Sequence, residues 1–227
     1  MANYVLVHGA WHGGWCWRAV AERLRAAGHQ VYTPTLTGLG ERAHLLREDV
    51  GLRTHVDDIT GVLRYEEIKD AVLVGHSYGG FVVREAADRS PDRVKRIVLL
   101  DAWVGRDGES IDDRAPEWFG HWVASATAGN VIAVPPVVAV GVSTAAAAAW
   151  LEGLMTPQPR RTFAQATSLT GAVDSIPCRA IVCTPGNGVP FGKWAAEFGW
   201  DTVAIESGHD AMLIAPDEVA RILLAEA

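Results

Sequence analysis

The chain alternates short apolar runs with longer amphipathic stretches. Apolar runs of strand length occur at residues 4–8, 30–33, 71–74, 94–100, 179–184 and 202–205. Helical patterns lie between and after them, at residues 17–27, 54–64, 79–89 and 216–225. The run Ile97-Val98-Leu99-Leu100 is apolar at every position, which is typical of a central parallel strand that is covered on both faces. The alternation predicts βαβ units and an α/β fold, with about six mostly parallel strands flanked by helices.

Residues that begin and end helices support these boundaries. Gly28 follows the first helical pattern, where a helix end needs a residue that adopts the left-handed conformation. Thr54 is the expected N-cap of the second helix. Pro216 stands in the first turn of the last helix, where proline is tolerated.

The segment at about 104–172 departs from this rhythm. It contains Pro135-Pro136, an alanine run at 145–149 and no clear strand. We therefore expect a small helical cap insertion within a single domain that spans residues 1–227. Open α/β sheets bind ligands beyond the carboxyl ends of their strands, so an insertion between two strands is a candidate lid.

Composition and net charge limit the classes of binding partner that we expect. A length of 227 residues suits one α/β domain, and 49% hydrophobic with 21% charged residues is an ordinary globular balance. The net charge of −7 repels phosphate backbones and anionic membrane surfaces, so nucleic acid and membranes are not expected partners. No apolar run reaches about 18 residues, so we expect no membrane span.

Targeting signals and cysteines bear on the compartment. No basic stretch followed by a long apolar run opens the chain, so no secretory signal is expected. Three cysteines without metal-binding spacing fit free thiols in a reducing compartment, which favours a cytoplasmic location. The sequence is compatible with a homodimer.

A candidate nucleophile lies in Gly75-His76-Ser77-Tyr78-Gly79. This G-x-S-x-G motif directly follows a predicted strand and precedes a predicted helix, which is the strand–turn–helix setting it requires. The glycines leave room for the backbone around a strained, tight turn. Ser77 is therefore the predicted nucleophile, and the backbone N–H of Tyr78 is a predicted oxyanion-hole donor.

A candidate general base, His209, follows the last predicted strand and precedes the C-terminal helix. A serine followed by a histidine near the C-terminus is the order in which α/β-hydrolases carry these groups. A second glycine-rich turn, with His8 and His12, follows the first strand and can aim a backbone N–H at an oxyanion. These two histidines lack a third ligand at sensible spacing, so no metal site is expected.

Four segments together resemble bacterial carboxylesterases of the α/β-hydrolase fold, and are similar to the plant methylesterase and hydroxynitrile lyase family: residues 7–15, 36–40, 75–80 and 208–213. The resemblance spans nearly the whole chain and is weakest in the cap. It implies small ester substrates, no cofactor, and the N–H of Ala10 as the first oxyanion donor. Hydroxynitrile lyases have a lysine after the histidine and a threonine in the first turn. Here Asp210 and Gly9 stand there, which favours an esterase.

The acid that orients the histidine has two candidates. The loop at 184–190, where hydrolases of this fold usually keep it, contains no carboxylate. Asp101, at the end of the predicted strand 94–100, is favoured because a strand-end position on the ligand face lets it reach Nδ1 of His209. Asn187, which stands where the plant enzymes have their acid, is the alternative.

The sequence therefore predicts a serine hydrolase that cleaves small carboxylic esters through a Ser77 acyl-enzyme, with His209 as base. A carbon–carbon lyase on the same fold is one alternative, and it would release product without an acyl-enzyme. A non-catalytic ligand receptor is another, and it would bind an intact ester without turnover.

Overall fold

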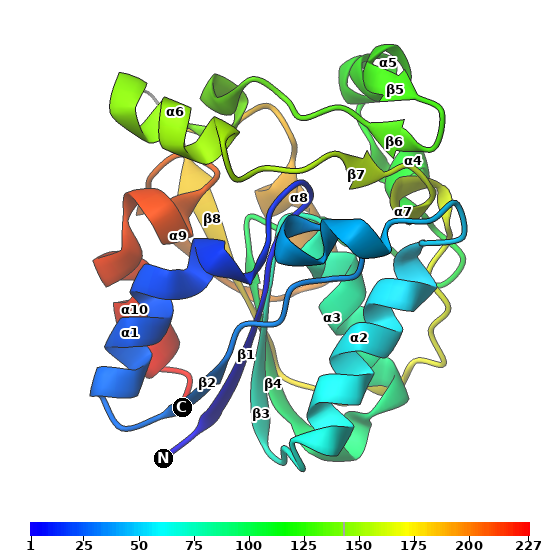
Figure 1. Ribbon diagram of the computed structural model, residues 1–227. Coiled ribbons are helices and arrows are strands. Elements are labelled where there is room, and N and C mark those ends of the chain that lie inside the picture. Colours follow the sequence, from blue (N-terminus) through cyan, green and yellow to red (C-terminus); the bar gives the residue numbers. More distant parts are fainter. Residues whose placement is uncertain (143) are drawn as a thin grey trace.

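The computed structural model describes residues 1–142 and 144–227, built around a central six-stranded sheet (Figure 1). The strands lie in the order β2-β1-β3-β4-β8-β9, and each neighbouring pair is parallel. Their bounds are Asn3–Val7 for β1, Gln30–Tyr32 for β2, Ala71–His76 for β3, Val94–Leu100 for β4, Cys178–Thr184 for β8 and Asp201–Glu206 for β9. The predicted six-stranded α/β sheet is confirmed.

Both faces of the sheet are covered, because successive side chains of a strand point to opposite sides. In β3, Leu73 packs into the core that includes α2 (Leu52–Tyr65) and α3 (Gly79–Arg89). Its neighbour Val74 packs into a second core with α1 (Arg18–Ala26) and α10 (Pro216–Leu224). In Figure 1 these two helix pairs lie on either side of the sheet.

The helix boundaries differ from the prediction in places. The expectation that Thr54 is the N-cap of α2 was wrong, because the helix begins at Leu52 after Gly51, and the Thr54 hydroxyl accepts the Gly51 N–H at 3.4 Å. Short elements without a sequence signature are η1 (Gly14–Trp17), η2 (Gly40–Leu45), η3 (Pro91–Arg93), η5 (Ala172–Ser175), α8 (Phe191–Glu197) and α9 (Ala211–Ile214). Among the helices described, none has the length and apolar character needed to cross a bilayer.

The segment between β4 and β8 crosses the end of the sheet at which β1 finishes (Figure 1). It carries α4 (Ile111–Arg114), α5 (Glu117–Ala126), η4 (Val137–Val140), α6 (Ala145–Glu152) and α7 (Arg161–Ala164). The expectation that it contains no strand was wrong. Thr127–Ala128 (β5), Val131–Ile132 (β6) and Gln158–Pro159 (β7) form an antiparallel sheet. Strands of two residues are too short to show an alternating pattern, so the sequence carried no signal for them.

Candidate active site

Ser77 lies in the sharp turn between β3 and α3, in the left-handed region with φ of +50°. Its carbonyl oxygen accepts a hydrogen bond from the Gly80 N–H at 3.0 Å, which closes the turn. A Cβ atom at Gly75 would stand 2.7 Å from the Gly79 carbonyl oxygen, and one at Gly79 would stand 2.8 Å from that of His8. The two motif glycines therefore permit the close backbone approach that the turn requires.

His209 and Asp101 meet at the carboxyl edge of the sheet, because they follow the parallel strands β9 and β4. Nδ1 of His209 donates to Oδ2 of Asp101 at 2.7 Å, and Oδ1 of Asp101 accepts the Cys183 N–H at 3.0 Å. The two side chains are 9% and 2% exposed, so this charge-assisted bond lies largely away from water. The imidazole also stacks on Phe191, with ring centroids 5.4 Å apart. The other ring nitrogen, Nε2, takes no part in this hydrogen bond.

Asn187 lies in the same region, but among the described residues no hydrogen bond joins it to the imidazole. Its amide oxygen accepts the N–H of Val189 at 3.1 Å, within its own loop. Of the two residues that the sequence left open, the structure therefore brings Asp101 to His209.

The glycine-rich turn after β1 lies beside Ser77. In the described residues, neither the Ala10 nor the Tyr78 backbone N–H donates to a protein acceptor. The next N–H along the turn, that of Trp11, is occupied by Oε1 of Gln158 in the cap at 2.9 Å. The two predicted oxyanion donors are therefore both available. The contact with Gln158 could not be found from sequence, since it joins positions 147 residues apart.

Two buried neutral histidines support these donors. Nδ1 of His8 donates to the Gly9 carbonyl oxygen at 2.8 Å, which belongs to the same peptide unit as the Ala10 N–H. The Tyr78 hydroxyl donates to Nδ1 of His55 at 2.8 Å. Burial lowers the pKa of His8 to about 3 and that of His55 to about 4. Both rings are therefore uncharged at neutral pH, which matches the roles that their hydrogen bonds require. The contribution of His55 had no sequence signal.

A cavity of about 470 Å³ is lined by Ser77, His209 and Ala10 among other residues. None of the described residues that line it is Asp, Glu, Lys or Arg. Seven of its described lining residues are Trp or Phe: Trp11, Trp103, Trp118, Phe119, Trp122, Phe163 and Phe191. Such a wall favours an uncharged, apolar ligand over a charged one.

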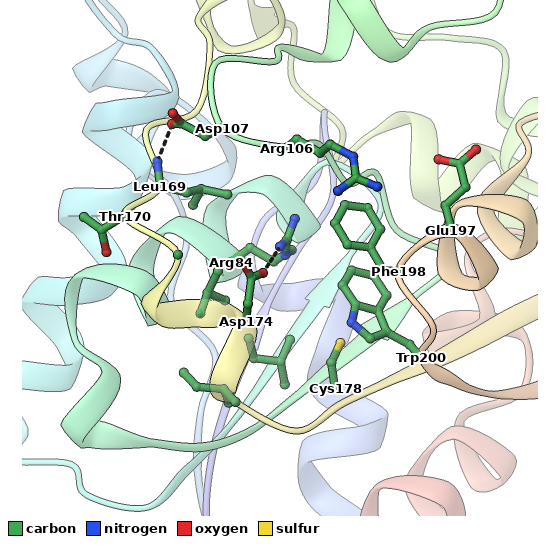
Figure 2. Close-up of a pocket in the computed structure, with 14 residues that line it drawn as sticks. Arg84, Arg106, Asp107, Leu169, Thr170, Asp174, Cys178, Glu197, Phe198 and Trp200 are labelled. Carbon is green, nitrogen blue, oxygen red and sulfur yellow. Dashed lines mark hydrogen bonds and ion pairs between the residues drawn. The ribbon is translucent and has the colours of Figure 1, made fainter.

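A second cavity, of about 550 Å³, carries charged side chains and has neither a serine nor a histidine among its described lining residues (Figure 2). There the guanidinium groups of Arg84 and Arg106 stack on Phe198, at 4.6 and 5.0 Å from the ring centroid. Arg84 also pairs with Asp174 at 3.3 Å. The predicted nucleophile and base therefore assign the candidate active site to the aromatic cavity.

The fold and this site are those of the α/β-hydrolases. The chain matches the alpha/beta hydrolase family over residues 4–222, and it belongs to that family. It is 38% identical over 240 residues to a carbendazim hydrolyzing esterase of Nocardioides sp., a match that covers 99% of each chain. Methylesterase 10 of Arabidopsis thaliana is 34% identical over 103 residues, which cover 45% of this chain and 38% of that one. The prediction of a carboxylesterase-type hydrolase is confirmed.

Solved structures support the fold. An extracellular α/β-hydrolase from a Paenibacillus species superposes with a TM-score of 0.89 at 24% identity, over 99% of this chain and 98% of that one. A methylesterase from Arabidopsis gives a TM-score of 0.82 at 21% identity, over 100% and 98%. The predicted α/β-hydrolase architecture is thus confirmed over the length of the chain.

Proposed function

We propose that this enzyme hydrolyses small, uncharged carboxylic esters through an acyl-enzyme on Ser77. One observation carries the proposal: Ser77 shares an apolar cavity with His209, whose Nδ1 proton is held by Asp101 at 2.7 Å. A base oriented in this way beside a serine in a nucleophile elbow is the arrangement that acyl transfer needs.

In acylation, Nε2 of His209 takes the Ser77 proton as Oγ bonds to the ester carbonyl carbon. The carbonyl oxygen becomes an oxyanion and is stabilised by the N–H groups of Ala10 and Tyr78. The ester C–O bond then breaks, and His209 gives its proton to the departing alcohol. Asp101 remains ionised throughout and stabilises the imidazolium that forms at each step.

In deacylation, a water molecule repeats the attack on the acyl-enzyme. His209 takes one proton from that water, and the same two N–H groups stabilise the second oxyanion. When the bond to Oγ breaks, the proton returns to Ser77 and the carboxylic acid leaves. No group is consumed, so the residues return to their starting states.

The aromatic wall supports a neutral substrate with a flat or apolar portion. A charged acyl group would lose its hydration without meeting an opposite charge among the described lining residues. The bacterial relative named for carbendazim hydrolysis makes that compound a reasonable member of the substrate panel.

The test compares wild type with Ser77→Ala on p-nitrophenyl acetate, p-nitrophenyl butyrate, a p-nitrophenyl hemisuccinate and carbendazim. We expect turnover of the neutral esters, much weaker turnover of the anionic hemisuccinate, and loss of all activity in Ser77→Ala. Mass spectrometry of the wild type after rapid quenching should detect an acyl group on Ser77. Hydrolysis that survives Ser77→Ala would refute the proposal.

The structure favours neither the carbon–carbon lyase nor the non-catalytic ligand receptor. A lyase of the related plant type has a lysine after the histidine, whereas Asp210 stands here and directs its carboxylate at His12. The receptor hypothesis drew slight support from the lack of an acid in the usual loop, and the 2.7 Å hydrogen bond between His209 and Asp101 counts against it. Neither alternative has an observation in its favour.

A further inference from the structure

A buried pair, His12 and Asp210, joins the two segments that carry the proposed oxyanion donor and base. His12 lies in the turn after β1, and its Nδ1 contacts the Ala10 carbonyl oxygen at 2.7 Å. Its Nε2 contacts Oδ2 of Asp210 at 3.0 Å. Asp210 directly follows His209, so one imidazole bridges a neighbour of each functional group.

The hydrogen bonds define the charges of this pair. A carbonyl oxygen and a carboxylate only accept, so both ring nitrogens of His12 must carry protons and the ring is an imidazolium. Burial opposes that charge, yet the Asp210 carboxylate raises the pKa of His12 above its ordinary value. Burial likewise opposes ionisation of Asp210, and the charge and hydrogen bond of His12 lower the pKa of this carboxyl. The pair is therefore ionic.

Hydrogen bonds around Asp210 hold the loop that carries His209. Its backbone N–H donates to the Val140 carbonyl oxygen of the cap at 3.0 Å. His76, next to the nucleophile, donates from Nε2 to the His209 carbonyl oxygen at 3.1 Å and lies 3.8 Å from Oδ1 of Asp210. Neither His12 nor Asp210 lines the aromatic cavity, so neither side chain touches a substrate there.

Packing alone does not account for an ion pair at this position. His12 is 1% and Asp210 0% exposed, and apolar residues of similar volume often replace buried ion pairs without loss of stability. A metal site does not account for it either. Both nitrogens of His12 are already engaged, and no metal-binding group of three side chains occurs within residues 1–142 and 144–227.

We propose that His12 and Asp210 form a positioning pair that sets the distance between the Ala10 N–H and the His209 imidazole. This inference rests on the proposed function, because it concerns the oxyanion and base of that reaction. The pair acts through its neighbours and takes no part in bond making. Displacement of a catalytic group by about 1 Å can cost on the order of 100-fold in rate, so a small loop shift is enough to matter.

The first test is Asp210→Asn, with Asp88→Asn as the matched control. Asp88 is also buried, at 4% exposed, and accepts hydrogen bonds from the loop at 170–173, away from the cavity. Active sites are counted by the amount of a fluorophosphonate probe that attaches to Ser77, so unfolded protein does not enter the rate. Per labelled site, we expect Asp210→Asn to lower kcat on p-nitrophenyl acetate by about 10- to 100-fold, with KM within about threefold. Asp88→Asn should lose thermal stability and keep the kcat of the wild type.

The second test is a double-mutant cycle with His12→Gln. Removing both charges in His12→Gln with Asp210→Asn leaves no unpaired ion, so we expect the double variant to be destabilised less than either single variant. If the pair acts as a unit, the double variant loses about as much kcat per site as the worse single variant. Losses that multiply would show two independent structural effects and would overturn the inference.

The rate of probe attachment separates this inference from the proposed function. Phosphonylation of Ser77 needs the same base and oxyanion donors but no ester substrate. If the wild type reacts with the probe and turns over no ester, the proposed function fails, while slower labelling of Asp210→Asn still supports the positioning pair. If Asp210→Asn matches the wild type in both labelling rate and kcat, the positioning pair is refuted and the esterase proposal stands.

Discussion

The Asp101→Asn variant isolates the role of the acid, because asparagine keeps the shape and the backbone of the residue it replaces. Asp101 has φ of +44°, and asparagine tolerates this left-handed conformation as aspartate does. Its amide oxygen can still accept the Cys183 N–H, which Asp101 now accepts at 3.0 Å. The amide nitrogen then faces Nδ1 of His209 and can only donate. The imidazole proton moves to Nε2, where it blocks transfer from Ser77.

The expected loss follows from the burial of this contact. The carboxylate is 2% exposed and 2.7 Å from the imidazole, so water cannot substitute for it and the imidazolium loses its counter-charge. In serine proteases the equivalent change of an aspartate to asparagine costs about 10⁴-fold in kcat. That factor corresponds to about 5.4 kcal/mol of transition-state stabilisation. We expect a loss of about 1,000-fold or more, with little change in KM.

The assay is hydrolysis of p-nitrophenyl acetate, with kcat expressed per Ser77 titrated by fluorophosphonate. Asn187→Ala is the comparison variant, since among the described residues the Asn187 side chain hydrogen-bonds only to the Val189 N–H of its own loop. It should keep kcat within about threefold and lose about 1 kcal/mol of stability or less. If Asp101→Asn retains more than a tenth of the wild-type kcat, or if Asn187→Ala loses as much as Asp101→Asn, the assignment of the acid is wrong.

Three further outcomes are expected. Ser77→Gly should unfold at a higher urea concentration than Ser77→Ala, because glycine relieves a φ of +50° that costs other residues about 1–2 kcal/mol; equal midpoints would show that the elbow is unstrained. Gly9→Ala should lower kcat per titrated site by about 10-fold or more, because its Cβ would stand 2.8 Å from that of Ser77; an unchanged kcat would contradict this crowding. His55 has a pKa of about 4 when folded and about 6.5 when unfolded, so stability is complete above pH 6.5 and falls by up to about 3 kcal/mol as the pH drops to 4. Urea unfolding between pH 4 and pH 7 measures this loss. In His55→Gln, the free energy of unfolding should depend on pH as if one proton fewer were taken up on unfolding.

Much of the architecture could be predicted from local pattern. The fully apolar run in β4 and the strand–turn–helix setting of Ser77 are visible within a few residues. Parallel strands all end at one edge of a sheet, so Ser77, Asp101 and His209 could be expected to converge once the strands were recognised. The small sheet of the cap could not be predicted, because its strands are two residues long and one of them contains Pro159.

The sequence by itself determined the α/β fold and predicted the candidate nucleophile and base, because each depends on periodic burial or on residues adjacent in the chain. Only the tertiary structure shows that Asp101, and not Asn187, hydrogen-bonds to His209 among the described residues, because this depends on where each side chain finds a partner after the loops have folded. It alone revealed the pair of His12 and Asp210, whose members are 198 positions apart. Contacts of this kind are set by the geometry of loops packed against one another, and no local periodicity records that geometry.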